Sequence, residues 1–220
     1  MTTGTSTAAP LPAIAEKHHF LLRKLHSLSG IVPLGLFFVE HMVSNFAAVG
    51  ANGEVEFNAT VKFLRGLPFV VFLEFFGIIL PLFFHGILGM WIAFEGRVNV
   101  GRYSTPRNWA YVLQRVSGVI ALVFVVFHLL HFRFASFGKP FEDVAFQAVH
   151  DRLSNPVWLV AYVIGVAATA FHLGNGVPLF CNSWGLTITP RSRSVMTRVG
   201  AAVGIVLFAM GTASAFAFQR

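Results

Sequence analysis

Five long apolar segments constrain the fold of this chain more than any other feature. Crossing about 30 Å of hydrocarbon takes about 20 helical residues, and each segment is long enough to do so. Backbone exposed to lipid must satisfy its own hydrogen bonds, and these segments are too long and too continuously apolar for barrel strands. The sequence therefore predicts an all-α integral membrane bundle of five transmembrane helices. The expected spans are residues 27–49, 69–94, 110–132, 157–180 and 195–218, after an N-terminal tail, residues 1–26, with a short amphipathic segment.

The composition leaves little of the chain for a soluble domain. Only 11% of the 220 residues are charged, whereas an average globular chain has about a quarter. The net charge of +7 is therefore interpreted as membrane topology and contact with lipid, and no nucleic-acid binding is expected. Cys181 is the one cysteine, which excludes a disulfide within the chain and an iron–sulfur cluster held by the chain's own thiolates.

The charges of the loops predict the orientation. With the N-terminus in the cytoplasm, 10 of the 16 lysines and arginines lie on the cytoplasmic side, and most acids lie in the two outer loops. Since cytoplasmic loops of membrane proteins carry an excess of basic residues, the N-terminus is expected inside and the C-terminus outside. The expected location is a bacterial cytoplasmic membrane, crossed several times.

A weak internal repeat relates the first span to the third and the second to the fourth. LHSLSG (residues 25–30) aligns with LQRVSG (residues 113–118), and a histidine follows each Ser-Gly pair, His41 and His128. Phe-His pairs end at His85 and His172, and each is followed by a loop with Thr-Pro-Arg. Two parallel copies of a helix pair, related about the membrane normal, are typical of such a pattern.

Four histidines in these four spans fall at two depths. An ionisable side chain in hydrocarbon is costly and marks a candidate functional site. At 1.5 Å of rise per residue, His41 and His128 lie about 21 and roughly 27 Å from the cytoplasmic edge. His85 and His172 lie about 12 to 14 Å from that edge. Each pair comes from two helices that run in the same direction.

Two histidine pairs at two levels are the arrangement that bis-imidazole ligation of a b-type haem requires, with one imidazole nitrogen on each side of the iron. The sequence predicts two b haems, an outer one held by His41 and His128 and an inner one held by His85 and His172. The alternative for any single histidine is a hydrogen bond across the bundle. Zinc would need four ligands at one level, whereas these split two and two.

The remaining histidines are less suited to haem. His131 follows His128 by three residues and is an alternative ligand, but it adjoins Arg133 at the interface, so His128 is favoured. His18, His19, His26 and His150 lie in or beside the predicted loops and are expected to be solvated.

Polar and small residues near the histidines provide further candidates. Four polar residues near the inner ends of the first and third spans are candidate contacts for haem propionates or a quinone head group: Ser29, Gln114, Arg115 and Ser117. For Arg115, contact with lipid phosphate is the alternative. Gly77, Gly118 and Gly165 precede His85, His128 and His172, and their missing side chains would let a flat macrocycle approach. Helix packing is the alternative for these glycines and is expected for Gly200 and Gly204.

The chain resembles the single-chain, five-helix, two-haem cytochrome b membrane subunits of succinate dehydrogenases and fumarate reductases. The resemblance covers nearly the whole chain, in family order and spacing. The segments that carry it are RKLHSLSG with FVEHMVSNF, LPLFFHGILGMWIAFEGR, YSTPRNWAYVLQRVSGVIALVFVVFHLLHFR, FHLGNGV and WGLTITPRS. In this family the histidines of spans 2 and 4 hold the inner haem and those of spans 1 and 3 the outer haem, the same pairs as deduced from depth.

The resemblance implies a complex in which a flavoprotein subunit oxidises succinate in the cytoplasm and an iron–sulfur subunit relays electrons to this membrane anchor. The positive charge of the two inner loops also leads us to expect that their arginines, Arg97, Arg102, Arg107, Arg191 and Arg193, dock the iron–sulfur subunit, with contact to anionic lipid as the alternative for each of them. Quinone is the expected electron acceptor, with menaquinone favoured over ubiquinone, because two-haem members usually use menaquinone. No residue of this chain indicates a dicarboxylate site, so its catalytic residues are unknown.

Three alternatives differ in their expected features. A fumarate reductase anchor has the same architecture, but some members use a glutamate two residues before the fourth-span histidine, where this chain has Ala170. A cytochrome b subunit of a hydrogenase or formate dehydrogenase would lack the TPRNW and TPRS loops found here. A haem-free transporter would use the histidines as a proton relay, and it would show no haem spectrum.

Overall fold

The computed structural model describes residues 13–135, 138–139 and 145–220, and of residues 13–18 only the backbone. Within this part of the chain every regular element is helical, and five helical stretches are long and apolar enough to cross a membrane. The predicted all-α bundle with five spans is therefore confirmed. These stretches are His19–Phe46, Val70–Glu95, Pro106–Phe134, Pro156–Ser183 and Pro190–Ala217.

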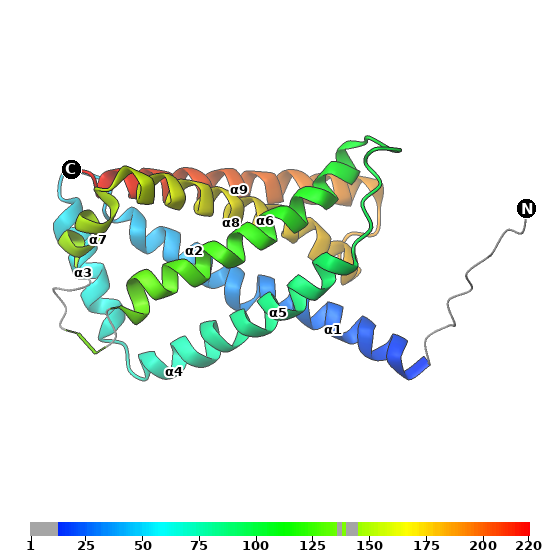
Figure 1. Ribbon diagram of the computed structural model, residues 1–220, viewed down its shortest axis with the longest axis horizontal. Helices are drawn as coiled ribbons and strands as arrows, with labels where there is room; N and C mark the ends of the chain where they lie inside the picture. Colours follow the sequence, from blue (N-terminus) through cyan, green and yellow to red (C-terminus); the bar gives the residue numbers. More distant parts are fainter. Residues whose placement is uncertain (1–12, 136–137, 140–144) are drawn as a thin grey trace, which may run out of the picture.

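The five spans are built from a larger set of helical elements (Figure 1). The first span joins α1 to α2, the second joins α4, the π-helical η1 and α5, and the third joins α6 to the π-helical η2. The bounds are α1 Ala13–Ile31, α2 Pro33–Phe46, α3 Gly53–Arg65, α4 Val70–Glu74, η1 Phe75–Ile79, α5 Leu80–Glu95, α6 Pro106–His128, η2 Leu129–Phe134, α7 Phe146–Leu153, α8 Pro156–Ser183 and α9 Pro190–Ala217.

Three of the long helices begin at a capping residue followed by proline. Thr105, Asn155 and Thr189 each accept a backbone N–H bond from the first turn of the next helix, and a proline follows each of them. Proline suits the first helical position because its missing N–H would have no helical partner there. The Thr-Pro-Arg motifs of the sequence are thus the starts of α6 and α9.

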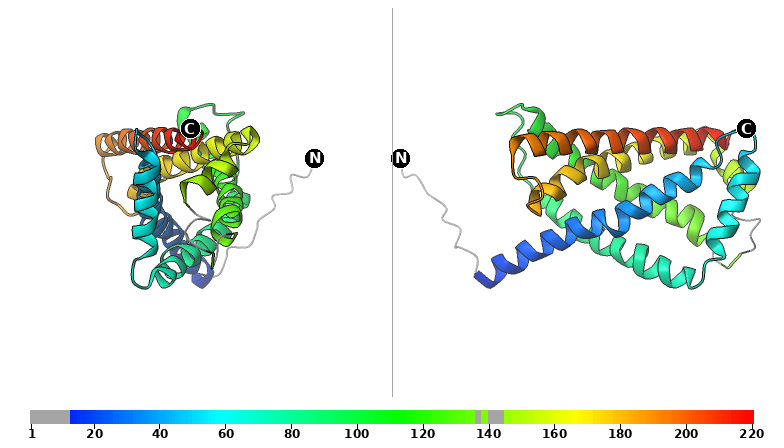
Figure 2. Two further views of the ribbon diagram at one scale, coloured as in Figure 1. Left: turned by 90° about the vertical axis from the view of Figure 1, so that its left-hand side faces the viewer. Right: turned by 180° about the vertical axis from the view of Figure 1, so that it is seen from behind.

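The two ends of the bundle differ (Figures 1 and 2). One end has the short helices α3 and α7 and the C-terminus, and we call it the α3–α7 end. The opposite end has the connections 96–105 and 184–189, and we call it the short-loop end. A cluster of buried side chains from the α2–α3 connection, α3, α7, α8 and the C-terminal residues closes the α3–α7 end: Ala48, Phe57, Phe146, Leu153, Tyr162, Ala217 and Phe218.

Helices α8 and α9 approach each other through glycines. A Cβ atom added at Gly200 would lie 2.2 Å from the carbonyl oxygen of Gly174, and one at Gly204 would lie 3.0 Å from the carbonyl oxygen of Ala170. Helices in lipid associate by such close backbone packing, because apolar side chains gain little from leaving lipid. Gly200 and Gly204 therefore serve helix packing, as the sequence predicts.

An ion pair links the end of α4 to the π-helical η2, toward the α3–α7 end. Glu74 immediately precedes η1, and Arg133 lies within η2. The Arg133 guanidinium donates to the Glu74 carboxylate through both Nε, at 3.1 Å, and a terminal nitrogen. The second and third spans are therefore tied together one helical turn beyond His128.

Candidate functional site

His85 of α5 and His172 of α8 face each other in the half of the bundle near the short-loop end. Their ring centroids are 6.2 Å apart and their planes are nearly perpendicular, at 87°. The structure thus brings together the two histidines that the sequence placed at the same depth.

The Nδ1 atoms of these two histidines point to backbone carbonyls of neighbouring helices. His85 Nδ1 lies 2.9 Å from the carbonyl oxygen of His26 on α1, and His172 Nδ1 lies 3.0 Å from that of Gln114 on α6. Because a carbonyl oxygen only accepts, Nδ1 carries the hydrogen in both rings. Each Nε2 is therefore left with a lone pair, which is the form of imidazole that binds a metal.

His41 of α2 and His128 at the end of α6 form the second facing pair, closer to the α3–α7 end. Their ring centroids are 5.7 Å apart with an interplanar angle of 75°. His128 Nδ1 lies 3.3 Å from the hydroxyl of Tyr162, and the Asn45 amide nitrogen lies 3.3 Å from His41 Nε2. Sequence reasoning missed Tyr162 and Asn45, although a hydroxyl or amide within an apolar span is a signal that could have been weighed.

His131 is turned toward a different set of side chains. Its ring lies 5.0 Å from that of Phe127 and 5.5 Å from that of Trp158, measured between centroids. Its Nδ1 is buried and has no hydrogen-bond partner among the described residues. The structure therefore places His128, and not His131, against His41.

The expectation that His26 is solvated is wrong. Its ring stacks on that of His85, with centroids 4.0 Å apart and planes 11° from parallel, and its Nε2 is buried without a hydrogen-bond partner in the described part of the chain. α1 continues the first span toward the short-loop end, so His26 lies inside a helix packed on α5. The internal repeat indicates the burial of His26, because His26 aligns with Gln114, which lies within the third span.

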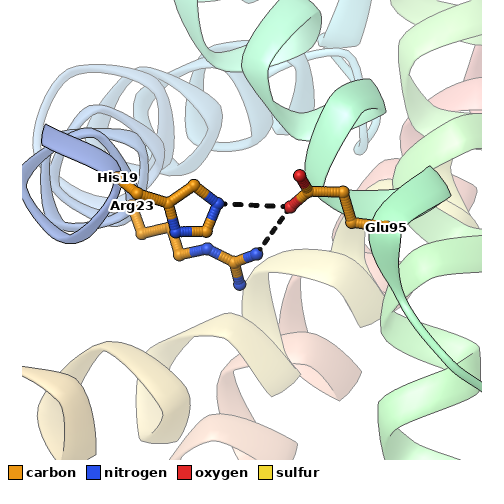
Figure 3. A network of polar contacts seen from close by, with 3 residues as sticks. All are labelled: His19, Arg23 and Glu95. Carbon is orange, nitrogen blue, oxygen red and sulfur yellow. Dashed lines mark hydrogen bonds and ion pairs between the residues drawn. The ribbon is translucent and has the colours of Figure 1, made fainter. Parts of the chain in front are cut away.

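Two of the other loop histidines, His19 and His150, also have partners. His19 lies 3.3 Å from the Glu95 carboxylate, which Arg23 contacts at 2.9 Å, so this cluster joins α1 to the end of α5 (Figure 3). His150 Nδ1 donates to the carbonyl of Phe218 at 2.7 Å and is half-buried, so it is not freely solvated as expected. The side chain of His18 lies outside the described residues.

The four candidate propionate or quinone contacts divide into two groups. Ser29, Gln114 and Ser117 are engaged around the His85–His172 pair: each serine Oγ lies 3.4 Å from a histidine Nδ1, and the Gln114 amide donates to the carbonyl of His172 at 3.1 Å.

Arg115 differs from these three. Its guanidinium lies over the Tyr111 ring, with Cζ 3.4 Å from the centroid, and its buried Nε has no partner among the described residues. Arg115 is thus the candidate with an unused donor.

The glycines lie against different neighbours from those expected. A Cβ atom added at Gly118 would lie 2.7 Å from Cε1 of His172, so this glycine faces the partner pair and not His128. A Cβ atom at Gly165 would lie 2.1 Å from the Phe124 ring, and one at Gly77 would meet nothing within 4 Å.

Comparison with known proteins gives two findings. The family model described as succinate dehydrogenase/fumarate reductase transmembrane subunit matches residues 95–212. The succinate dehydrogenase cytochrome b558 subunit of Bacillus subtilis (strain 168) is 42% identical over 206 residues, which cover 93% of this chain and 100% of that relative.

Proposed function

Since this chain belongs to the succinate dehydrogenase/fumarate reductase transmembrane subunit family, we propose that it is the cytochrome b membrane anchor of a succinate dehydrogenase. In this role it carries electrons from an iron–sulfur subunit through two b haems to quinone. The flavoprotein subunit of the same complex oxidises succinate. The relative from Bacillus subtilis is named as a cytochrome b subunit of succinate dehydrogenase, which supports this role over that of a fumarate reductase anchor.

The observation that carries the proposal is the geometry of the two histidine pairs. A metal–imidazole nitrogen bond is about 2 Å long, so two imidazoles on opposite sides of one iron have ring centres about 6 Å apart. The measured separations are 6.2 Å for His85 and His172 and 5.7 Å for His41 and His128. The residues therefore fit two bis-imidazole haems, one between each pair.

A b-type haem supplies one-electron transfer, while the protein supplies its position, its burial and its axial nitrogens. The lone pairs on Nε2 of His85 and His172 are available because both Nδ1 atoms are hydrogen-bonded. The buried Nε of Arg115 and Nε2 of His26 lack partners in the described part of the chain. Since a buried polar atom without a partner is costly, these two groups are suited to contact haem propionates or a quinone head group.

The surroundings of Ala170 favour succinate oxidation. The Ala170 side chain is 1% exposed and is buried in a cluster with Met42 and Leu207. A carboxylate at this position would have to be buried among apolar side chains, which costs several kcal/mol. A proton path through a glutamate at this point of α8 therefore has no counterpart in this chain.

The orientation that we propose puts the short-loop end in the cytoplasm. Five exposed arginines lie at this end: Arg97, Arg102, Arg107, Arg191 and Arg193. The His85–His172 pair then lies nearer the iron–sulfur subunit, and the His41–His128 pair nearer the outer surface. Electrons that move outward do so with the membrane potential, worth about 2.3 kcal/mol per 100 mV. This assistance suits a low-potential acceptor such as menaquinone.

Haem stoichiometry in the purified complex tests the proposal. We expect the wild-type complex to contain flavoprotein and iron–sulfur subunits, two low-spin haems per anchor chain and a reduced-minus-oxidised b-type spectrum. His85→Ala and His172→Ala should each leave one haem. His150→Ala is the matched control, because this histidine donates to the backbone carbonyl of Phe218 and belongs to neither pair, and it should retain two haems. Two haems in either His85→Ala or His172→Ala would refute the assignment, and a wild-type chain without haem would refute the function.

A further inference from the structure

The two Ser-Gly elements of the internal repeat lie directly against the histidines of one pair. In the first copy, Ser29 Oγ donates to the carbonyl of His26 at 2.9 Å, and the same carbonyl lies 2.9 Å from His85 Nδ1. Ser29 Oγ itself is 3.4 Å from that Nδ1. Because the serine proton is used on the carbonyl, a lone pair of Oγ faces the Nδ1 hydrogen.

The second copy repeats this arrangement on another pair of helices. Ser117 Oγ donates to the carbonyl of Gln114 at 3.2 Å, and this carbonyl lies 3.0 Å from His172 Nδ1. Ser117 Oγ is 3.4 Å from the same nitrogen. The same hydrogen-bond triangle therefore occurs twice, once for each imidazole of the pair.

The glycine that follows each serine makes room for the imidazole edge. A Cβ atom at Gly30 would lie 2.4 Å from Cε1 of His85, and one at Gly118 would lie 2.7 Å from Cε1 of His172. Real Cβ atoms do not approach other atoms this closely, so a side chain at either position would displace the ring. The missing side chain of each glycine and the hydroxyl of the serine before it therefore act on the same imidazole ring, and both come from one turn of the helix.

The other histidine pair is held differently. His128 Nδ1 has the Tyr162 hydroxyl at 3.3 Å, and His41 has the Asn45 amide 3.3 Å from its Nε2. Within the described residues, the hydrogen bonds to these two rings come from side chains and not from carbonyls beside a Ser-Gly element. The repeated element thus belongs to the His85–His172 pair specifically.

We propose that Ser29-Gly30 and Ser117-Gly118 are a duplicated positioning element for the haem between His85 and His172, an inference that rests on the proposed function. Each element fixes the tautomer and the rotation of one axial imidazole, so that Nε2 is presented to the iron. Hydrogen bonds to the far nitrogen of a ligating histidine set its orientation and its basicity. The element also gives a role to the Ser-Gly pairs that recur in α1 and α6, the helices that do not supply these two ligands.

Alanine substitution of the glycines tests the space requirement. Gly30→Ala and Gly118→Ala should each lower the haem content of the purified complex from two haems to one, with the haem between His41 and His128 retained. Gly176→Ala is the matched control, because its added Cβ would lie 3.6 Å from the nearest atom, an ordinary contact with the Gln114 amide. It should retain both haems.

Alanine substitution of the serines tests the hydrogen bond with a smaller change. Ser29→Ala and Ser117→Ala should retain both haems but shift the low-spin EPR signal and the midpoint potential of one of them. The affected haem should be the one that His85→Ala loses. Its EPR signal and its midpoint potential should both shift, because they depend on the angle between the imidazole planes and on the donor strength of Nε2. Ser214→Ala removes a buried hydroxyl that bonds the carbonyl of Met210 in the same way, and it should shift neither haem.

The outcomes separate this inference from the proposed function. Two haems with unchanged EPR signals and potentials in all four Ser-Gly variants would overturn the inference and leave the proposed function intact. A shift confined to the haem between His41 and His128 would also overturn it. A wild-type complex without haem would overturn both.

Discussion

Replacing His128 and His131 separately tests which histidine of the third span is a haem ligand. The two residues are three positions apart, and His131 lies within the π-helical η2. A π-helix holds more residues per turn than an α-helix, so His131 lies less than about 4.5 Å further along the axis, the rise of three α-helical residues. The ring of His128 is 5.7 Å from that of His41, the separation that one iron between two imidazoles needs. His131 instead packs on Phe127 and Trp158.

The size of the displacement decides the expected result. Ligand distances in metal sites vary by only about 0.2 Å, so His131, which is several ångströms further along the axis and packs on Phe127 and Trp158, cannot replace its neighbour without moving the helix. The Glu74–Arg133 ion pair joins the third span to the second within the same segment, which opposes such a movement. His128→Ala should therefore lose one haem of two completely, with no rescue by His131.

The assay is the haem content of the purified complex, measured together with reduced-minus-oxidised spectra. His128→Ala should contain one haem per chain, and His131→Ala should contain two. The double variant should match His128→Ala. Two haems in His128→Ala together with one in His131→Ala would transfer the ligand role to His131 and place the third span about one turn deeper in the membrane than we infer.

Two further predictions concern docking and helix packing. Arg107→Glu combined with Arg191→Glu should release the flavoprotein and iron–sulfur subunits while both haems remain. Glutamate is favourable near a helix N-terminus, so the double variant should not unfold α6 or α9. Lys62→Glu on α3 is the control. Normal copurification and activity would instead show that these arginines contact lipid only. Gly200→Val should separate α8 from α9, because its Cβ would meet a backbone carbonyl at 2.2 Å, and should lower the yield of folded complex in a thermal assay. Gly101→Val should not lower this yield, because an added Cβ would have nothing within 4 Å. Equal melting of the Gly200→Val and Gly101→Val complexes would refute the packing argument.

The sequence by itself determined the architecture and the depth of the candidate ligands. Apolar length alone predicts five spans, because hydrocarbon thickness sets the length of a helix that crosses it. Regular helical rise then predicts that His41 and His128 lie at one level and His85 and His172 at another. These quantities depend on distance along a helix, which the order of residues specifies directly.

Only the tertiary structure decided which sides of the helices meet. It places His26 against His85, Gly118 against His172 and Tyr162 beside His128, none of which the sequence analysis predicted. A helix that is apolar on all sides has no pattern that says which face is buried. In lipid, apolar burial does not select the face either, so the rotation of each helix follows from backbone packing and hydrogen bonds with neighbours distant in the chain.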